Sequence, residues 1–316
     1  MEEVFYHEPV LLNESIGYLL GTGQKDLNSN TSSKRVYVDC TLGGGGYTKK
    51  ILTETGSEGT LVLAIDRDVF AIEHSKKVLS DLADRIIFIQ GNFGDIAEII
   101  LNAGFNKVDG VVMDLGLSTY QLNSEEGFSY QKDTALDMRA DKNQRLTAAD
   151  ILNNYSKEEL SNLFFKYGEL RYSRQIALDI SEFRKTKKLE TTFELVDILK
   201  KKVPPRFLNS DLSRLFQALR IEVNNEMENL ERVLKDSAEM LNENGKIAAV
   251  SYHSLEDRIV KQAFRNTASL KVLTKKPVEA TEEEIKNNVR ARSAKLRVAE
   301  KVTEISINKN KYRRGN

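Results

Sequence analysis

Short apolar runs alternate with amphipathic stretches through the first third of the chain. Four near-continuous apolar runs of strand length lie at residues 36–41, 60–66, 86–91 and 108–116. Such runs are typical of strands that are buried on both faces of a parallel sheet. The segments between them place apolar residues three and four positions apart, as amphipathic helices do. The alternation predicts right-handed β-α-β units, and therefore an α/β fold with an open, Rossmann-like sheet.

After the fourth run the pattern becomes helical. Residues 124–211 are mostly polar and show helical spacing, with no strand of comparable strength. A long amphipathic stretch over 212–245 is predicted to be one helix that ends at Gly245, and a fifth strand is expected directly after it. We therefore predict a discontinuous α/β domain, residues 1–123 and 212–316, that is interrupted by an all-helical insertion.

Composition narrows the class of protein without pointing to a partner. The 316 residues carry 47 basic and 47 acidic side chains, so the net charge gives no sign of nucleic-acid binding. One cysteine and three scattered histidines argue against a disulfide-rich fold and a Cys/His zinc site, and no metal is expected. The first residues lack the pattern of a signal peptide, and no apolar run reaches the ~18–20 residues of a membrane span. We expect a cytoplasmic protein with no membrane partner.

Residues 43–46 are four consecutive glycines between the first predicted strand and a predicted helix. A P-loop would place a lysine directly after the last glycine, where Tyr47 stands, and the third glycine of a dinucleotide fingerprint would fall at Lys49. Asp39, before the loop, would repel a pyrophosphate and attract a sulfonium group. Asp66 ends the second strand, where it can bind ribose hydroxyls. The loop favours S-adenosylmethionine, and a tight turn that binds nothing is the weaker alternative.

Polar residues at the ends of the later strands are candidates for the reaction. Asp114 ends the fourth strand at the centre of the sheet and, with Ser118, could hold the N–H groups of an amine; a helix cap is the alternative for Asp114. Phe93 could lie against an adenine ring or belong to the core. His253 ends the fifth predicted strand, residues 246–253, and could orient a base, remove a proton or serve as a structural histidine.

Two basic segments, 171–188 and 289–301, could bind phosphates, although a solvated charged face is the commoner explanation of such segments. Cys40 lies in the first strand, away from the loop where a base would enter. Methylation at cytosine C5 normally needs a cysteine nucleophile, so this chemistry is disfavoured.

A series of distinctive strings runs from residue 7 to about 300: HEPVLLNE, VDCTLGGGGY, AIDRD, DLGLSTYQL, EEGFSY, LDMRAD, FQALRIEVNNE, SYHSLEDRIVK and RARSAKLR. In this order they resemble the methyltransferase H family of bacterial small-subunit ribosomal RNA. The resemblance implies a class I S-adenosylmethionine-dependent methyltransferase sheet whose helical insertion recognises RNA. It also implies N4-methylation of a specific cytidine in the decoding centre (P site) of 16S ribosomal RNA, with this RNA in the small subunit as the partner. The oligomeric state stays open, a homodimer included.

The resemblance assigns cofactor contacts to Gly45, Gly46, Tyr47, Asp66, Phe93, Asp114 and Gln121. Predicted RNA contacts are Ser118, Arg139, Ser254, Arg290, Arg292 and Lys295. Asp114 and His253 are the predicted catalytic residues. Three places depart from the family pattern. Tyr47 stands where the family usually has histidine, Glu126 where it usually has arginine, and Thr134 and Ala135 where Gly-Pro more usually precedes LDMR. Two other functions remain open, a DNA amino-methyltransferase and a non-catalytic RNA-binding factor in ribosome assembly.

Overall fold

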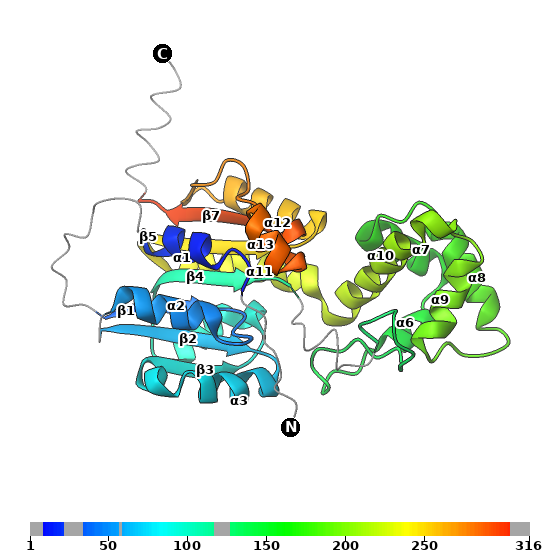
Figure 1. Cartoon of the computed structure of the whole chain (residues 1–316), viewed down its shortest axis with the longest axis horizontal. Helices are drawn as coiled ribbons and strands as arrows, with labels where there is room; N and C mark the ends of the chain where they lie inside the picture. Colours follow the sequence, from blue (N-terminus) through cyan, green and yellow to red (C-terminus); the bar gives the residue numbers. More distant parts are fainter. Residues whose placement is uncertain (1–8, 22–33, 57–58, 117–126, 304–316) are drawn as a thin grey trace, which may run out of the picture. The chain divides into compact units, whose positions relative to one another are not determined.

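The computed structural model describes residues 9–21, 34–56, 59–116 and 127–303. These residues form two compact units (Figure 1). The α/β unit comprises the described residues of Tyr6–Gly116 and Met227–Asn316, and the helical unit those of Leu117–Glu226. Among the described residues, no helix combines the length and the apolar character that crossing a membrane requires.

The α/β unit is built on a seven-stranded sheet in the order β3-β2-β1-β4-β5-β7-β6. The strands are β1 Arg35–Asp39, β2 Thr60–Asp66, β3 Ile86–Gln90, β4 Val108–Asp114, β5 Leu241–Ser251, β6 Leu270–Val272 and β7 Lys295–Lys301. Strands β1 to β5 run parallel to one another, and β7 runs antiparallel to β5 and β6. The predicted Rossmann-like α/β fold is confirmed. The strand order reverses between β1 and β4, so ligands are expected at the carboxyl ends of these two strands.

Helices cover both faces of the sheet. They are α1 Leu12–Leu20, α2 Gly46–Thr55, α3 Val69–Val78, α4 Ile96–Asn102, α11 Glu226–Met240, α12 Ser254–Asn266 and α13 Glu282–Asn287, with short 3-10 turns η1 Ser80–Arg85, η2 Phe93–Asp95 and η3 Val289–Ser293. Neighbouring residues of β1 point to opposite sides: Tyr37 packs in one core with α1 and α2, and Val38 in a second core with α4, α11 and α12. This two-sided burial explains the continuous apolar runs in the sequence.

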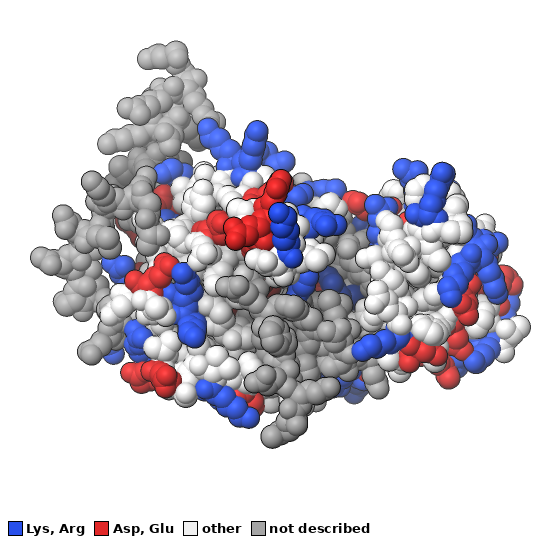
Figure 2. Space-filling model, viewed as in Figure 1, with Lys and Arg blue, Asp and Glu red and all other residues white. Residues whose placement is uncertain are grey.

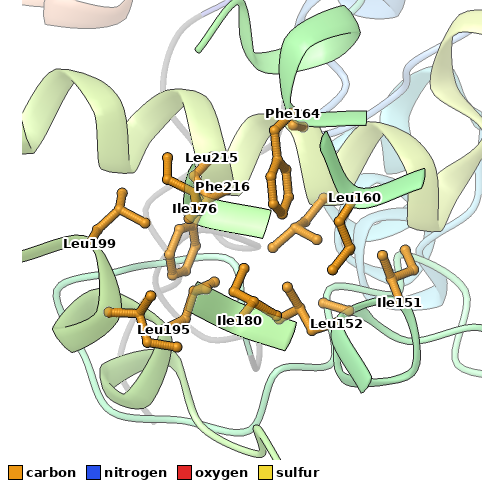
Figure 3. Close-up of a cluster of buried hydrophobic side chains, with 14 of the residues drawn as sticks. Ile151, Leu152, Leu160, Phe164, Ile176, Ile180, Leu195, Leu199, Leu215 and Phe216 are labelled. Atoms are coloured by element: carbon orange, nitrogen blue, oxygen red, sulfur yellow. The ribbon is translucent and has the colours of Figure 1, made fainter. Parts of the chain in front are cut away.

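The helical unit has its own hydrophobic core (Figure 3). Its helices are α6 Ala148–Asn154, α7 Lys157–Gly168, α8 Ser173–Phe183, α9 Thr192–Lys200 and α10 Pro205–Asn224. Phe164 of α7, Ile180 of α8 and Leu215 of α10 are fully buried among them. Reciprocal capping boxes fix the starts of α6, α7 and α9.

The predicted single helix over 212–245 is wrong. Asn225 adopts the left-handed conformation, with φ of 49°, and separates α10 from α11. Strand β5 begins at Leu241, so Gly245 lies inside a strand rather than at the end of a helix. The predicted boundary at residue 212 falls inside α10, which the structure assigns whole to the helical unit. An asparagine tolerates the left-handed conformation, and this was the only signal of the break in an otherwise continuous apolar pattern.

Candidate active site

The glycine loop at the carboxyl end of β1 is fixed by hydrogen bonds on both sides. The Gly43 N–H donates to Asp66 Oδ2 at 2.8 Å, and the Ser75 hydroxyl donates to the Gly43 carbonyl at 2.8 Å. Gly43 and Gly45 have positive φ values of 48° and 82°, which glycine adopts without strain. A Cβ at Gly45 would also lie 2.8 Å from the Leu79 side chain. The loop is therefore preformed, and its glycines are required by the backbone and by close packing.

The side chain of Tyr47 points into the core. It is only 3% exposed, and its hydroxyl donates to the Val10 carbonyl at 2.5 Å. The ring therefore connects the first turn of α2 to the segment that precedes α1. If Tyr47 contacts the cofactor as predicted, the backbone at the start of α2 is the group available for that contact.

Asp39 was expected to attract the sulfonium group, but its carboxylate binds neighbouring residues of the chain. It is fully buried, and its carboxylate accepts from the Thr48 hydroxyl at 2.8 Å and from the Thr41 N–H at 3.2 Å. Burial raises the pKa of Asp39 to about 6, against the lowering effect of these hydrogen bonds. Both carboxylate oxygens thus bind the chain itself, and Asp39 attaches β1 to the first turn of α2.

Asp66 ends β2 beside the glycine loop. One carboxylate oxygen accepts from the Gly43 N–H and the other from the Asp68 N–H at 2.9 Å. Burial raises the pKa of Asp66, although these backbone hydrogen bonds oppose it. A carboxylate oxygen can accept more than one hydrogen bond, so Asp66 retains acceptor capacity for hydroxyl groups.

Phe93 begins η2, directly after β3. It is half-buried against the core, and the guanidinium of Arg67 lies 5.3 Å from its ring centroid. Arg67 also donates to the Asn92 side chain at 2.8 Å, and Asn92 accepts from the Gly94 N–H. Arg67 thus links the segments that follow β2 and β3. Its guanidinium also occupies one face of the Phe93 ring.

Asp114 ends β4, next to the carboxyl end of β5. The residue is half-buried, but its Oδ1 atom is fully buried and makes no hydrogen bond of good geometry among the described residues. Burial raises the pKa of Asp114 to about 6, the Tyr252 hydroxyl and the Arg290 charge lower it, and Glu256 raises it further. The site therefore contains a carboxyl group that is poised to accept a proton or a hydrogen bond.

His253 is the N-cap of α12. Its Nδ1 accepts from the Glu256 N–H at 3.3 Å, and Glu256 in return accepts from the N–H groups of Tyr252 and His253 at 2.8 and 3.2 Å. The imidazole Nε2 is buried, lies 3.1 Å from Glu256 Oε1 and makes no hydrogen bond of good geometry among the described residues. His253 therefore has a structural role as the cap of α12. Its predicted catalytic role stays a prediction.

The predicted RNA contacts occupy different environments. Ser254 and Arg292 are exposed and Lys295 is half-buried at the start of β7. Arg290 turns toward Gly116, where a Cβ would meet its guanidinium at 2.7 Å. The predicted contacts of Ser118 and Gln121 lie outside the described residues.

Arg139, in the helical unit, is held by its own loop. Its guanidinium binds Asp137 through two hydrogen bonds of 2.7 and 3.0 Å and also donates to the Gln144 carbonyl at 2.7 Å. Burial alone would raise the pKa of Asp137, but hydrogen bonds from Arg139 and Lys142 outweigh it and hold the pKa at about 2. This gives Arg139 a structural role, and its predicted contact with RNA stays a prediction.

The sequence patterns missed two residues that shape the site. Pro9 packs on Gly46, and Tyr252 lies between Asp114 and Arg290. Both belong to the quoted strings, but proline and tyrosine carry no signature of cofactor binding. The aromatic residue near the end of the fifth predicted strand, residues 246–253, was the available signal for Tyr252.

Residues 4–302 match the profile of the MraW methylase family. The chain belongs to this family. It is also 40% identical to the "Ribosomal RNA small subunit methyltransferase H" of Finegoldia magna over 321 aligned residues, which cover 94% of this chain and 99% of that protein. S-adenosylmethionine is the methyl donor of this methylase.

Solved structures give weaker likenesses. A Clostridium thermocellum protein provisionally described as an rRNA-methylase aligns with a TM-score of 0.45 at 13% identity, over 94% of this chain and all of that one. An rRNA methylase from Streptococcus thermophilus aligns with a TM-score of 0.42 at 10% identity, over 92% of this chain and 96% of that one. Both scores lie below 0.5, so membership of the MraW methylase family rests on the sequence matches.

The residues present at the switch point suit S-adenosylmethionine. Among the described residues, the only atom within 4 Å of a Cβ built at Gly43 is the Thr41 carbonyl oxygen, at 3.8 Å. Asp66 offers acceptors for ribose hydroxyls, and Asp114 has a buried Oδ1 that makes no hydrogen bond of good geometry among the described residues. Acceptors of this kind match hydroxyl and ammonium groups, whereas a pyrophosphate would need donors and positive charge.

Proposed function

We propose that this chain methylates the N4 amine of a specific cytidine in the decoding centre (P site) of 16S ribosomal RNA, within the small ribosomal subunit. The name of the Finegoldia magna relative, which is 40% identical over nearly its whole length, supports an rRNA substrate. The buried Oδ1 of Asp114 at the end of β4 is the observation that carries the chemistry, because amine methylation needs an acceptor at the reacting nitrogen.

The exocyclic amine of cytosine is a poor nucleophile because its lone pair is delocalised into the ring. An acceptor on its N–H groups and a fixed approach to the methyl carbon are needed, and orientation of this kind can lower a barrier by about 7–11 kcal/mol in favourable cases. S-adenosylmethionine supplies the electrophilic methyl group. Asp114 would accept the N–H, with Ser118, four residues later in the sequence, as a second acceptor, and His253 is a secondary candidate for orienting the base.

Methylation at nitrogen rather than at carbon is supported by Cys40. It is the only cysteine of the chain. Its side chain is 2% exposed and lies in the hydrophobic core, directly after β1. Burial raises the pKa of its thiol well above the ordinary value, so a thiolate is strongly disfavoured. The C5 route, which needs a cysteine thiolate to add to the ring, therefore has no suitable nucleophile.

The helical unit and the basic residues of η3 are proposed to bind the RNA backbone, while the target base leaves its stack. The charges of the helical unit are mixed, since acidic and basic side chains alternate over it in Figure 2. Lys185 pairs with Glu182 at 2.8 Å and Lys187 pairs with Glu194. The phosphate-binding residues of this unit are therefore better sought among arginines such as Arg171 and Arg174 than among these paired lysines.

The test is mass-spectrometric mapping of 16S ribosomal RNA from cells that lack this protein. We expect one cytidine in the decoding centre to lose its N4-methyl group, and the wild-type gene but not the Asp114→Ala variant to restore it. Purified protein is also offered radiolabelled cofactor with small subunits, naked 16S RNA or duplex DNA. Label in DNA alone would identify a DNA amino-methyltransferase, and absence of both turnover and cofactor binding would identify an assembly factor.

A further inference from the structure

Arg290 and Tyr252 form a stacked pair at the carboxyl end of β4. The guanidinium carbon of Arg290, in η3, lies 5.5 Å from the centroid of the Tyr252 ring. Both side chains press on Gly116: a Cβ there would lie 2.7 Å from Arg290 Nη2 and 2.7 Å from Tyr252 Cε2. The pair therefore fills the space above the first residues after Asp114, and glycine at 116 makes room for it.

The pair also faces the carboxyl group of Asp114. The Tyr252 hydroxyl and the Arg290 charge both act on this group and favour its ionised form, against burial and the charge of Glu256. The Asp114 charge also contributes to raising the pKa of the buried Tyr47 hydroxyl, which burial raises most. The Tyr252 hydroxyl and Asp114 Oδ1 are both buried without a hydrogen bond of good geometry among the described residues. Two polar oxygens thus meet at the place where the proposed substrate amine would enter.

We propose that Tyr252 and Arg290 are positioning residues that hold the Asp114 carboxylate ready to accept an N–H of the substrate amine. This inference rests on the proposed function and changes the role of Arg290, which acts on Asp114 rather than on an RNA phosphate. In the reaction the amine nitrogen bonds to the methyl carbon as the carbon–sulfur bond breaks and its electron pair stays on sulfur. The proton that the nitrogen then loses passes to Asp114 and on to solvent.

The test compares pH profiles of methyl transfer for Arg290→Met and Tyr252→Phe with the wild type. Loss of the Arg290 charge is expected to move the acidic limb of the profile of kcat against pH up by about one pH unit. At low pH kcat therefore falls about tenfold, and it recovers at alkaline pH. Tyr252→Phe keeps the ring under Arg290 and removes only the hydroxyl, and we expect a shift in the same direction that is at least as large, because the Tyr252 hydroxyl lowers the pKa of Asp114 more than the Arg290 charge does. Arg292→Met, which removes an exposed charge two residues away, should raise the KM for RNA without moving the limb.

A second readout needs no substrate. In protein carrying ¹³C-labelled aspartate carboxyls, the Asp114 signal is assigned by its loss in Asp114→Asn, and its titration is followed in each variant. An upward shift in Arg290→Met supports the inference even if ribosomal RNA proves not to be the substrate. An unchanged titration, together with an unchanged limb and a raised KM for RNA, would show that Arg290 binds phosphate and would overturn the inference.

Discussion

Pro9 packs directly against Gly46, at the point where the glycine loop becomes α2. A Cβ at position 46 would lie 2.2 Å from Pro9 Cγ and 2.7 Å from Pro9 Cδ. Real Cβ atoms do not approach other atoms this closely, so any side chain at 46 must displace the segment before α1 or the loop. We expect Gly46→Ala to lower the unfolding free energy by about 1–3 kcal/mol and to weaken cofactor binding.

The same contact offers a rescue. Pro9→Ala removes the two ring carbons that a Cβ at Gly46 would strike, so the double variant should bind cofactor better than Gly46→Ala alone. Calorimetric titration of the four proteins of this cycle gives the coupling between the two positions. Additive effects would show that Pro9 is not what excludes a side chain at 46.

Tyr47→Phe should separate packing from cofactor binding. The variant loses the hydrogen bond to the buried Val10 carbonyl, and we expect a loss of about 1–2 kcal/mol in unfolding free energy by urea denaturation. The cofactor dissociation constant should change little, because the hydroxyl points into the core. Tyr18→Phe, at a side chain that is 37% exposed, is the control and should be neutral. A large loss of cofactor affinity in Tyr47→Phe would mean that the hydroxyl turns toward the ligand.

Asp66→Ala should weaken cofactor binding by more than about 1 kcal/mol, because it removes an acceptor for ribose and releases the Gly43 N–H. Isothermal titration of the purified protein measures this directly. Asp68→Ala is the matched control: it removes the carboxylate that caps α3 through the Phe70 N–H, and should reduce stability alone. Unchanged cofactor affinity in Asp66→Ala would refute the assignment of Asp66, at the end of β2, as a ribose-binding residue.

The sheet could be predicted because burial on both faces leaves a continuous apolar run, which is visible in one dimension. Asp66 and Asp114 were predicted as site residues because topology places the ends of parallel strands along one edge. The role of Asp39 was not predictable in the same way. Whether a carboxylate at a strand end faces a ligand or the next helix depends on a single partner, here the Thr48 hydroxyl, and sequence spacing does not specify that choice.

The break between α10 and α11 and the Arg290–Tyr252 pair show the same limit. Apolar spacing continues through Asn225, so only a left-handed backbone conformation, and not the pattern, separates the helices. Arg290 and Tyr252 are far apart in sequence and meet because β5 and β7 are neighbours. The basic string RARSAKLR suggested phosphate binding, because the sequence shows the charge of Arg290 but not the direction in which its side chain points.

Thr48→Val should make stability depend more strongly on pH. The folded-state pKa of Asp39, about 6, lies above that of the unfolded chain, so the folded state binds the extra proton between about pH 4 and pH 6. Stability therefore falls as pH rises through this window, by about 3 kcal/mol for a shift of about two units. Removing the Thr48 hydroxyl raises this pKa further and extends the fall to higher pH. We expect urea denaturation to show a loss of about 2 kcal/mol at pH 7 and a smaller loss at pH 5.

The control for this effect is in the same helix. Thr53→Val removes an exposed hydroxyl that donates to the Lys49 carbonyl, and its effect should be small and independent of pH. If Thr48→Val costs the same at pH 5 and pH 7, Asp39 does not change its protonation in this range.

A structural role and an RNA-binding role of Arg139 predict opposite effects of its substitution. Its guanidinium is engaged by Asp137 and by the Gln144 carbonyl, so Arg139→Met should lower the unfolding free energy by about 2 kcal/mol. Asp137→Asn should have a similar effect, and the double variant should be no worse than either, because both break one interaction. Arg145→Met, at an exposed arginine six residues away, should leave stability unchanged. A phosphate contact predicts the opposite: unchanged stability, with the salt dependence of 16S RNA binding reduced by about one unit of slope.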